Sequence, residues 1–328
     1  MSRRVNPLEG VSERWRPLVE RSVELLREHQ DPGGAWPASP DFAPYGYSWF
    51  RDGSFIAEGA SAAGLIEEAD RFHGWCLRVL EREKPAVERV LALLAEGKQP
   101  ADSDYLPARY RLDGTRQEDD WWNFQVDGYG TWLWALERHH MRSGSGDPTA
   151  YAAGIETAVR YLVATGTDTC RDWWEENRDQ THVTTLAGVA AGLRAAVRMG
   201  TLPQPLRTEA VAVAEHCCSL VRTRGVVDGH LVKRLDGTEV DASLLAVAAL
   251  YDVLPLDDPL VTATVAAIEE RLVDGGVHRY EADTFYGGGQ WPVLAALLAA
   301  DDARVADACR LAGRVGRGRF AVRAIRRR

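Results

Sequence analysis

The sequence predicts an all-helical fold, an (α/α)6 barrel in which an outer and an inner ring of helices alternate along the chain. Apolar residues recur at helical spacing through most of the 328 residues, and strand-like patterns are confined to short stretches near 225–240 and 276–279. Helices with a single apolar stripe alternate with helices that are apolar or small on every side, as expected where exposed helices surround buried ones. A helical solenoid would alternate in the same way, but the sequence shows no repeat of fixed period.

The expected outer helices have one apolar stripe and recognisable ends. Asp147-Pro148 and Asp258-Pro259 each place a capping aspartate before a proline, the order typical of a helix N-terminus. Pro85 is the expected break within residues 67–96, which form one long helix or two. The six outer helices are Ser12–Gln30, Glu67–Glu96, Asp147–Val163, Pro205–Arg224, Asp258–Leu272 and Asp301–Gly313.

The expected inner helices lack a polar face. One of them, at residues 182–199, is rich in alanine and glycine, which lets neighbouring helices approach closely. The inner helices are Gly53–Leu65, Asp127–Met141, His182–Met199, Asp241–Val253 and Trp291–Ala300. Six outer helices therefore alternate with five inner ones, and the last inner helix of the barrel is missing from the pattern. We expect a single domain over residues 1–312 and a tail at 313–328.

Long segments precede the inner helices, whereas the other connections are short. These segments are Asp31–Asp52, Gly97–Val126, Gly166–Thr181, Gly225–Val240 and Val273–Gln290. Loops of this length inside a compact domain are usually functional. Because each leads into an inner helix, we expect them to gather at one end of the barrel, which is the candidate active face.

Composition and charge exclude several classes of protein. A net charge of −9 argues against a nucleic acid or another polyanion as partner. The apolar runs are shorter than the roughly 20 residues of a membrane span, and Met1–Gly10 lacks the apolar stretch of a signal peptide. Five cysteines without a Cys-x-x-Cys pair indicate reduced thiols, so we expect a cytoplasmic protein; its oligomeric state is left open. Neither a metal nor a cofactor is expected, since His139-His140 and Cys217-Cys218 lack metal-ligand spacing.

The five loops contain most of the tryptophans and the densest groups of charged residues. Tyr45–Asp52, Trp121–Asp127, Arg171–Asn177 and His278–Trp291 each set aromatic rings beside Asp, Glu or Arg. Indole faces suit the C–H faces of a sugar ring, and polar groups with two hydrogen-bonding atoms suit its hydroxyls. The loops therefore favour a small carbohydrate as ligand.

Each of these features also has a purely structural explanation. Asp52 and Asp127 are explained equally well as N-caps of the helices that follow them. Arg51 and Asp52 are also explained as a structural ion pair, and paired acids such as Glu175 and Glu176 are often only solvated. The tryptophans at 132 and 134 are better explained as core than as a platform for a ligand. Only the joint occurrence of the motifs favours a site.

Four segments together resemble the motif regions of glycoside hydrolase family 15. They are Tyr45–Asp52, Trp121–Asp127, Asp172–Glu176 and Arg279–Trp291, and they occur in the family's order. The family comprises glucoamylases, glucodextranases, some trehalases and short bacterial isomaltose glucohydrolases, and the variant at 285–291 is most similar to the last group. The resemblance implies an (α/α)6 barrel that hydrolyses an α-glucoside, a small oligosaccharide such as isomaltose.

The resemblance also implies individual roles. Glu175 corresponds to the general acid that protonates the glycosidic oxygen, and Glu176 to a contact with the leaving-group sugar. Arg51 and Asp52 correspond to the pair that holds the far hydroxyls of the terminal glucose, which makes the enzyme exo-acting. The other implied substrate contacts are Tyr45, Trp49, Trp121, Trp174, Arg279, Phe285 and Trp291, of which the last is also explained as core.

The chemistry of an inverting glycosidase fits these residues independently. Such an enzyme needs a carboxylic acid of raised pKa and a carboxylate base about 6.5–9.5 Å apart, so that a water fits between them and the sugar. Glu175 lies between Trp174 and Glu176, where desolvation and a like charge are expected to raise its pKa.

The end of the sequence departs from the family's pattern. The family's base is a glutamate near the end of the catalytic domain, but no acidic residue follows Asp307, and Gly313–Arg328 holds seven arginines among sixteen residues. A truncated or frame-shifted end is one explanation, and a genuine anion-binding tail is another. We therefore expect the 328-residue chain to hydrolyse α-glucosides negligibly.

Two other functions stay open on the sequence alone. A non-catalytic, sugar-binding relative would keep the binding residues and lack the base. An unrelated helical interaction protein would have no affinity for glucose-like ligands.

Overall fold

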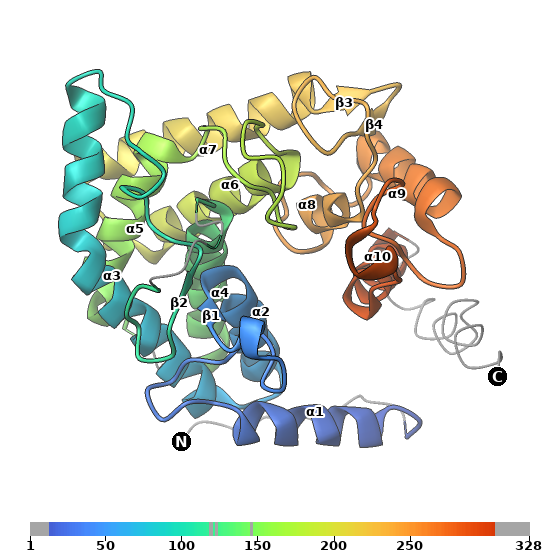
Figure 1. Cartoon of the computed structure of the whole chain (residues 1–328), viewed down its shortest axis with the longest axis horizontal. Coiled ribbons are helices and arrows are strands. Elements are labelled where there is room, and N and C mark those ends of the chain that lie inside the picture. Colours follow the sequence, from blue (N-terminus) through green and yellow to red (C-terminus); the bar gives the residue numbers. More distant parts are fainter. Residues whose placement is uncertain (1–12, 118–120, 122–123, 145–146, 306–328) are drawn as a thin grey trace. The chain divides into compact units, whose positions relative to one another are not determined.

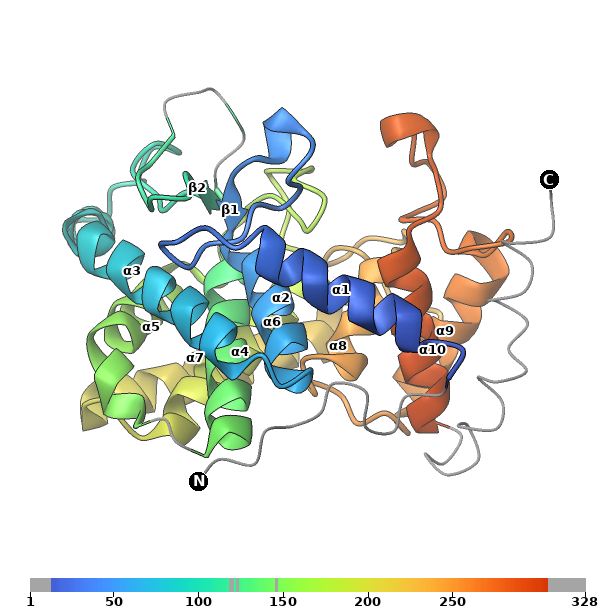
Figure 2. The same cartoon turned by 90° about the horizontal axis from the view of Figure 1, so that it is seen from below.

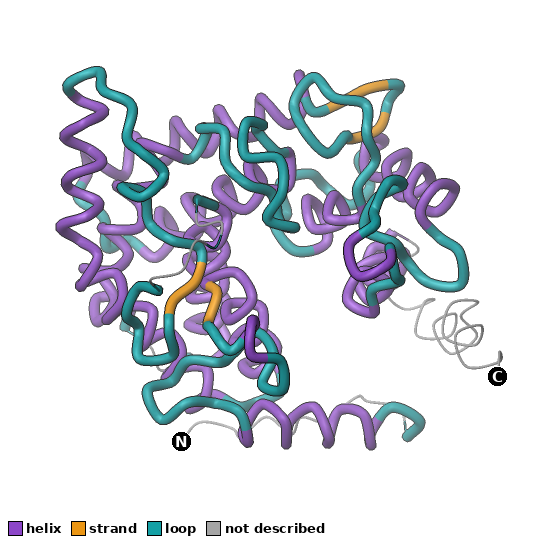
Figure 3. Tube along the Cα trace, in the orientation of Figure 1, coloured by secondary structure: helices purple, strands orange, loops and turns teal. Residues whose placement is uncertain are grey.

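The computed structural model describes residues 13–117, 121, 124–144 and 147–305. Helices dominate this part of the chain, and its strands are short (Figure 1, Figure 3). The α-helices are α1 (Arg16–Glu28), α2 (Phe50–Ala62), α3 (Ile66–Ala95), α4 (Asp127–Ser143), α5 (Ala152–Thr165), α6 (Val183–Met199), α7 (Gln204–Arg224), α8 (Ala246–Ala249), α9 (Pro259–Leu272) and α10 (Pro292–Val305). None of them, over the described residues, combines the length and apolarity that a membrane span requires.

The strands form two antiparallel pairs of two residues each. β1 (Ser48–Trp49) pairs with β2 (Arg109–Tyr110), and β3 (Val226–Val227) pairs with β4 (His230–Leu231). The second pair confirms the strand pattern near 225–240, whereas the first was not expected from the sequence. The short 3-10 helices are η1 (Ala43–Tyr45), η2 (Pro148–Tyr151), η3 (Ala242–Leu245) and η4 (Phe285–Gly287).

The chain divides into two compact units. The first comprises residues 1–168 and 191–214, and the second comprises residues 169–190 and 215–328. Two of the three boundaries between the units fall inside α6 and α7, and the third lies between α5 and α6.

In the first unit, α2 packs against α3 and α4, and α3 packs against α5 (Figure 1, Figure 2). The Phe50 ring lies 4.7 Å from the Tyr129 ring, and both are buried. A Cβ atom at Gly192 of α6 would lie 2.3 Å from the carbonyl oxygen of Gly130 in α4, so glycine permits this close approach. The first unit thus confirms the close packing expected of the small-residue helix.

In the second unit, α9 packs against β4 and η3, while α10 packs against η3 and α8. The side chain of Asp258 accepts a hydrogen bond from the backbone N–H of Leu260 at 3.0 Å and caps α9. In the first unit, the side chain of Asp147 accepts from the N–H of Thr149 in the same way. Both capping aspartates expected from the sequence are therefore confirmed.

The expected difference between inner and outer helices is confirmed in the described residues. α4 is buried along most of its length, and Trp132 and Trp134 belong to its buried side chains, as their explanation as core required. By contrast, burial in α9 is confined to a stripe that includes Val261 and Ile268. The expected stripe of α1 is an exception, because no residue of this helix is buried and Leu18 is 60% exposed.

Several expected helix boundaries differ from the structure. Pro85 does not divide residues 67–96, because α3 continues through it; the apolar face that includes Val87 and Val90 is buried and offsets the roughly 3 kcal/mol cost of an internal proline. The expected helix 241–253 is reduced to η3 and the single turn α8, where the N–H groups of Leu250 and Tyr251 both bond back to Ala246 and end it. The expected boundary at Ala300 is absent, because α10 continues to Val305.

Several expectations concern parts of the chain outside the described residues. These parts are the cap at Ser12, most of the expected outer helix Asp301–Gly313, and the basic tail at 313–328.

Candidate active site

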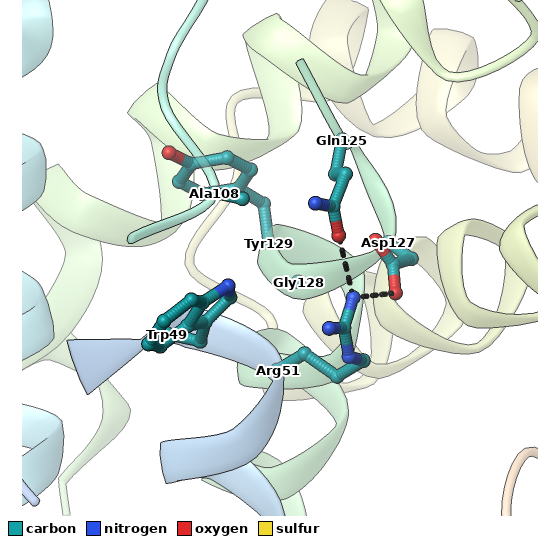
Figure 4. Close-up of a pocket in the computed structure, with 7 residues that line it drawn as sticks. All are labelled: Trp49, Arg51, Ala108, Gln125, Asp127, Gly128 and Tyr129. Atoms are coloured by element: carbon teal, nitrogen blue, oxygen red, sulfur yellow. Dashed lines mark hydrogen bonds and ion pairs between the residues drawn. The ribbon is translucent and has the colours of Figure 1, made fainter. Parts of the chain in front are cut away.

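Four polar residues of the first unit form one group, here called the Arg51 cluster: Arg51, Asp52, Gln125 and Asp127. Figure 4 shows three of them, Arg51, Gln125 and Asp127. Arg51 Nη1 donates to Gln125 Oε1 at 2.6 Å and to Asp127 Oδ2 at 3.2 Å. Asp52 Oδ2 lies 3.5 Å from Arg51 Nε. The two arginine contacts fix the direction of the guanidinium group beside a small pocket that Trp49 also lines.

The Arg51 cluster contains buried polar atoms with unused hydrogen-bonding capacity. Asp52 Oδ2, Gln125 Nε2 and Asp127 Oδ1 have no hydrogen-bond partner within the described part of the chain. Burial raises the pKa of Asp127, although Arg51 opposes the shift. Because buried polar atoms are normally paired, one donor and two acceptors next to a guanidinium group suit a ligand that carries several hydroxyls.

The structure rejects the explanation of the two aspartates as N-caps. The N-cap residues of α2 and α4 are Trp49 and Val126, and neither helix has a side-chain cap. Asp52 and Asp127 lie instead in the first helical turn, where a carboxylate is favoured by the helix dipole and its side chain is free to turn toward other groups. The contact between Arg51 and Asp52 is present, but the shorter contact of Arg51 is with Asp127.

An aromatic wall lies in the same unit. The ring of Trp49 is 5.8 Å from that of Tyr45 and 6.3 Å from that of Trp121, and Tyr45 and Trp121 are 6.1 Å apart. The buried guanidinium group of Arg109 lies between two rings, 4.1 Å from Tyr47 and 4.2 Å from Trp121. Arg109 therefore supports the wall through cation–π contacts.

In the second unit, residues 170–180 form a loop, here called the acid loop. Its two ends are joined by an isolated antiparallel β-bridge between the backbones of Cys170 and Gln180. The buried side chain of Asp172 organises it: Oδ1 accepts from the backbone N–H groups of Trp174 and Glu176, both at 2.9 Å. The carbonyl oxygen of Asp172 accepts from the N–H of Glu175 at 2.9 Å. Glu175 has a φ of 65°, in the left-handed region that non-glycine residues seldom adopt. Strain of this kind is often found at functional sites.

Arg279 and Tyr280 contact the second carboxylate of the acid loop. Arg279 Nη2 lies 3.7 Å from Glu176 Oε1, and the Tyr280 hydroxyl donates to Glu176 Oε2 at 2.7 Å. Arg279 is 2% exposed and donates to both oxygens of Asp283, at 2.7 and 2.5 Å. Burial and the hydrogen bond to Glu176 raise the pKa of Tyr280.

Aromatic rings surround the guanidinium group of Arg279. Its central carbon lies 5.2 Å from the ring of Trp174, 5.2 Å from that of Phe285 and 5.5 Å from that of Trp291. Phe285 is 40% exposed, so part of this group faces solvent. The arrangement offers both ring faces and charged groups to a ligand.

Each predicted site residue falls into one of two sets. The structure brings together, in the first unit, Tyr45, Trp49, Arg51, Asp52 and Trp121. In the second unit, it brings together Trp174, Glu176, Arg279, Phe285 and Trp291 around the loop that carries Glu175. Among the described residues no group of acidic, histidine or cysteine side chains has the arrangement of a metal site.

Several residues of these groups were not predicted as site residues. Asp172, Lys233 and Asp241 form a buried network in which Lys233 Nζ lies 3.0 Å from Asp172 Oδ2 and 3.2 Å from Asp241 Oδ2. Asp241 also accepts from Trp174 Nε1, at 2.9 Å to Oδ2. A signal existed for Lys233: the sequence has three lysines, and this one directly follows two apolar residues in a strand-like stretch.

The chain matches the family model described as Glycosyl hydrolases family 15 over residues 16–316. It belongs to this family. It is 46% identical over 288 residues to an isomaltose glucohydrolase of Kribbella flavida, an alignment that covers 87% of this chain and 74% of the relative. It is 28% identical over 293 residues to a trehalase of Mycolicibacterium smegmatis, covering 82% of this chain and 43% of the trehalase. The family membership and the first relative make this protein a glycosidase that acts on α-glucosides.

Solved structures agree with the family. A wild-type glycosidase, 44% identical, superimposes with a TM-score of 0.87 over 91% of this chain and 81% of its own. A variant described as a glycosidase in complex with glucose matches with the same TM-score of 0.87. The glucoamylase from Saccharomycopsis fibuligera, 16% identical, has a TM-score of 0.64 over 93% of this chain and 75% of its own, and shows the fold alone. The expected (α/α)6-barrel type of fold is thus confirmed.

Proposed function

We propose that this glycosidase is an exo-acting, inverting enzyme that releases glucose from the non-reducing end of short α-gluco-oligosaccharides, with isomaltose as the preferred substrate. The relation to the isomaltose glucohydrolase of Kribbella flavida supports the substrate. The observation that carries the chemistry is the conformation of the acid loop, where Asp172 holds the backbone on both sides of Glu175.

Glu175 is the general acid of this proposal. Its carboxyl group donates a proton to the glycosidic oxygen as the bond between that oxygen and the anomeric carbon breaks, and the leaving sugar departs as a neutral alcohol. Water attacks the anomeric carbon from the opposite face, which inverts its configuration. The proton of this water needs a carboxylate base, a role that we assign to no residue of the chain.

The other side chains bind the sugar. Arg51 and Asp52 hold hydroxyls of the terminal glucose, and the buried atoms of the Arg51 cluster that have no hydrogen-bond partner in the described part of the chain support this role. Tyr45, Trp49 and Trp121 supply ring faces for its C–H groups. The remaining contacts are assigned, with Glu176, to the leaving-group side: Trp174, Arg279, Phe285 and Trp291.

Sugar binding without turnover is a second candidate function, because the buried polar atoms of the Arg51 cluster suit a hydroxyl-rich ligand whether or not it is cleaved. Two measurements distinguish the proposals: the release of glucose from isomaltose, and the binding of isomaltose as followed by calorimetry. Release of glucose as the β-anomer, followed by NMR, supports the inverting hydrolase. Binding without release supports the second function.

The role of Glu175 is tested with Glu175→Gln, with Glu88→Gln on the exposed face of α3 as the control. We expect Glu175→Gln to lower kcat for isomaltose by at least about 10²–10⁴-fold with little loss of binding, because a neutral amide cannot supply the proton. Hydrolysis of α-glucosyl fluoride should fall far less, since fluoride leaves without protonation. Wild-type turnover of isomaltose by Glu175→Gln would remove Glu175 from the mechanism.

A further inference from the structure

Lys233 is the positive centre of a buried network behind the acid loop. Its side chain is 9% exposed, and its Nζ atom lies 3.0 Å from Asp172, 3.2 Å from Asp241 and 3.9 Å from Glu176. The same atom lies 4.0 Å from the centre of the Tyr280 ring. An ammonium group in this place has few alternatives to these partners, because water has little access to it.

The backbone of Lys233 is fixed at the point where the acid loop leads into α6. Its carbonyl oxygen accepts from the N–H of Val183 at 3.0 Å, and its own N–H donates to the carbonyl oxygen of Glu239 at 2.8 Å. The side chain therefore starts from a backbone held on both sides. It brings a charge from a separate segment of the chain to the carboxylates of the acid loop.

The two carboxylates nearest to Lys233, those of Asp172 and Asp241, also hold part of the acid loop. Asp172 accepts the N–H groups of Trp174 and Glu176, and Asp241 accepts the indole N–H of Trp174 together with the N–H of Ser243. Burial alone would lower the pKa of Lys233, but Asp241 and Asp172 raise it, so the lysine is a cation. Without this cation, two buried carboxylates would face each other next to Glu176 and would be driven apart or protonated.

We propose that Lys233 is a positioning residue for the general acid. By holding the side chains of Asp172 and Asp241 close together, it keeps the turn at Trp174–Glu176 in the form that gives Glu175 its left-handed backbone. It does not need to touch the substrate. This inference rests on the proposed function, in which Glu175 donates the proton.

The experiment compares two substrates that differ in their need for the acid. Lys233→Met keeps most of the length of the side chain and removes the charge; Lys98→Met makes the same change at an exposed lysine, 64% of whose side chain is accessible. We expect Lys233→Met to lower kcat/KM for isomaltose about 10²-fold or more, because a small displacement of a catalytic group costs this much. For α-glucosyl fluoride we expect a loss below about tenfold. Lys98→Met should leave both unchanged.

A purely structural role for Lys233 predicts equal losses on both substrates, and that result would overturn the proposal. If Lys233→Met fails to fold, the double variant Lys233→Met/Asp241→Asn removes one charge of each sign and keeps an acceptor for Trp174; the same split between substrates is expected. A crystal structure of the folding variant gives a readout that needs no turnover. If the wild-type chain cleaves neither substrate, the proposed function fails, and the φ angle of Glu175 in the variant decides the inference about Lys233. A left-handed Glu175 with both Asp172 contacts intact would overturn it.

Discussion

The left-handed backbone of Glu175 makes a prediction about stability that needs no enzyme assay. We compare Glu175→Gly with Glu175→Ala, and Glu176→Gly with Glu176→Ala as the matched pair at the next residue. Both variants at a position remove the same carboxylate, so the difference between their free energies of unfolding reports the effect of the backbone conformation alone. The φ of Glu175 is 65°, whereas Glu176 does not have a positive φ.

The expected magnitudes follow from this difference in φ. An L-residue in the left-handed region costs roughly 1–2 kcal/mol, and glycine avoids this cost. Glycine, however, lowers the free energy of unfolding by roughly 0.4–1 kcal/mol relative to alanine, because it gives the unfolded chain more conformational freedom. Glu175→Gly should therefore be more stable than Glu175→Ala by about 0.5–1 kcal/mol. At position 176 the order should reverse, with alanine more stable by a similar amount.

Urea denaturation of the four variants measures the free energies of unfolding. The difference between the two comparisons should be roughly 1–2 kcal/mol, which is the cost of the left-handed conformation. If glycine is less stable than alanine by the same amount at both positions, then Glu175 does not have the conformation described, and the argument for a strained acid loop is wrong.

Two further predictions concern the first unit. Arg51→Ala should raise KM for isomaltose and lower kcat/KM by about 10–10²-fold, because a charge-assisted contact is worth about 1.5–3 kcal/mol; unchanged kinetics with a lower melting temperature would make the arginine purely structural. Burial, reinforced by His139 and His140, holds the pKa of His73 well below its ordinary value, so the unfolded chain binds a proton first as the pH falls below about 6.5. The stability that is lost between pH 7 and pH 5 should therefore be smaller in His73→Leu than in the wild type, by at most about 2 kcal/mol, as measured by urea denaturation at both pH values. An equal loss in both proteins would contradict this.

The sequence was sufficient to predict which helices are buried and which are half-exposed, and to recognise the motifs, because both depend on residues that are close together in the chain. Apolar periodicity separates the buried α4 from the half-exposed α9, and Trp174-Glu175-Glu176 is recognisable as three consecutive residues. It was less reliable for helix ends. Pro85 is a local signal for a break, but the burial of the helix on both sides of it outweighs that signal, and this burial depends on the whole fold.

The contacts that join the acid loop to other segments could not be predicted, since they link residues that are distant in the sequence. Hydrophobic periodicity reports which side chains are buried and is silent about which buried charges meet. Asp172 alone, two residues before Trp174, suggests a local turn, because aspartate side chains often bond the backbone N–H two residues on. The conformation of Glu175 follows from that turn only when Lys233 and Asp241 hold Asp172 in place.

The same reasoning explains why a motif is weaker evidence for catalysis than the contacts behind it. Two adjacent glutamates on a solvated loop would have interchangeable backbones and similar surroundings. Here Glu176 is bound by Tyr280 and lies near Arg279 and Lys233, and the backbone of Glu175 has a left-handed conformation that Glu176 does not share. Different surroundings for two carboxylates are what a site needs if one is to carry a proton and the other is to stay charged. The residues that create the difference lie on other segments, so the assignment of the acid depends on the fold as much as on the motif.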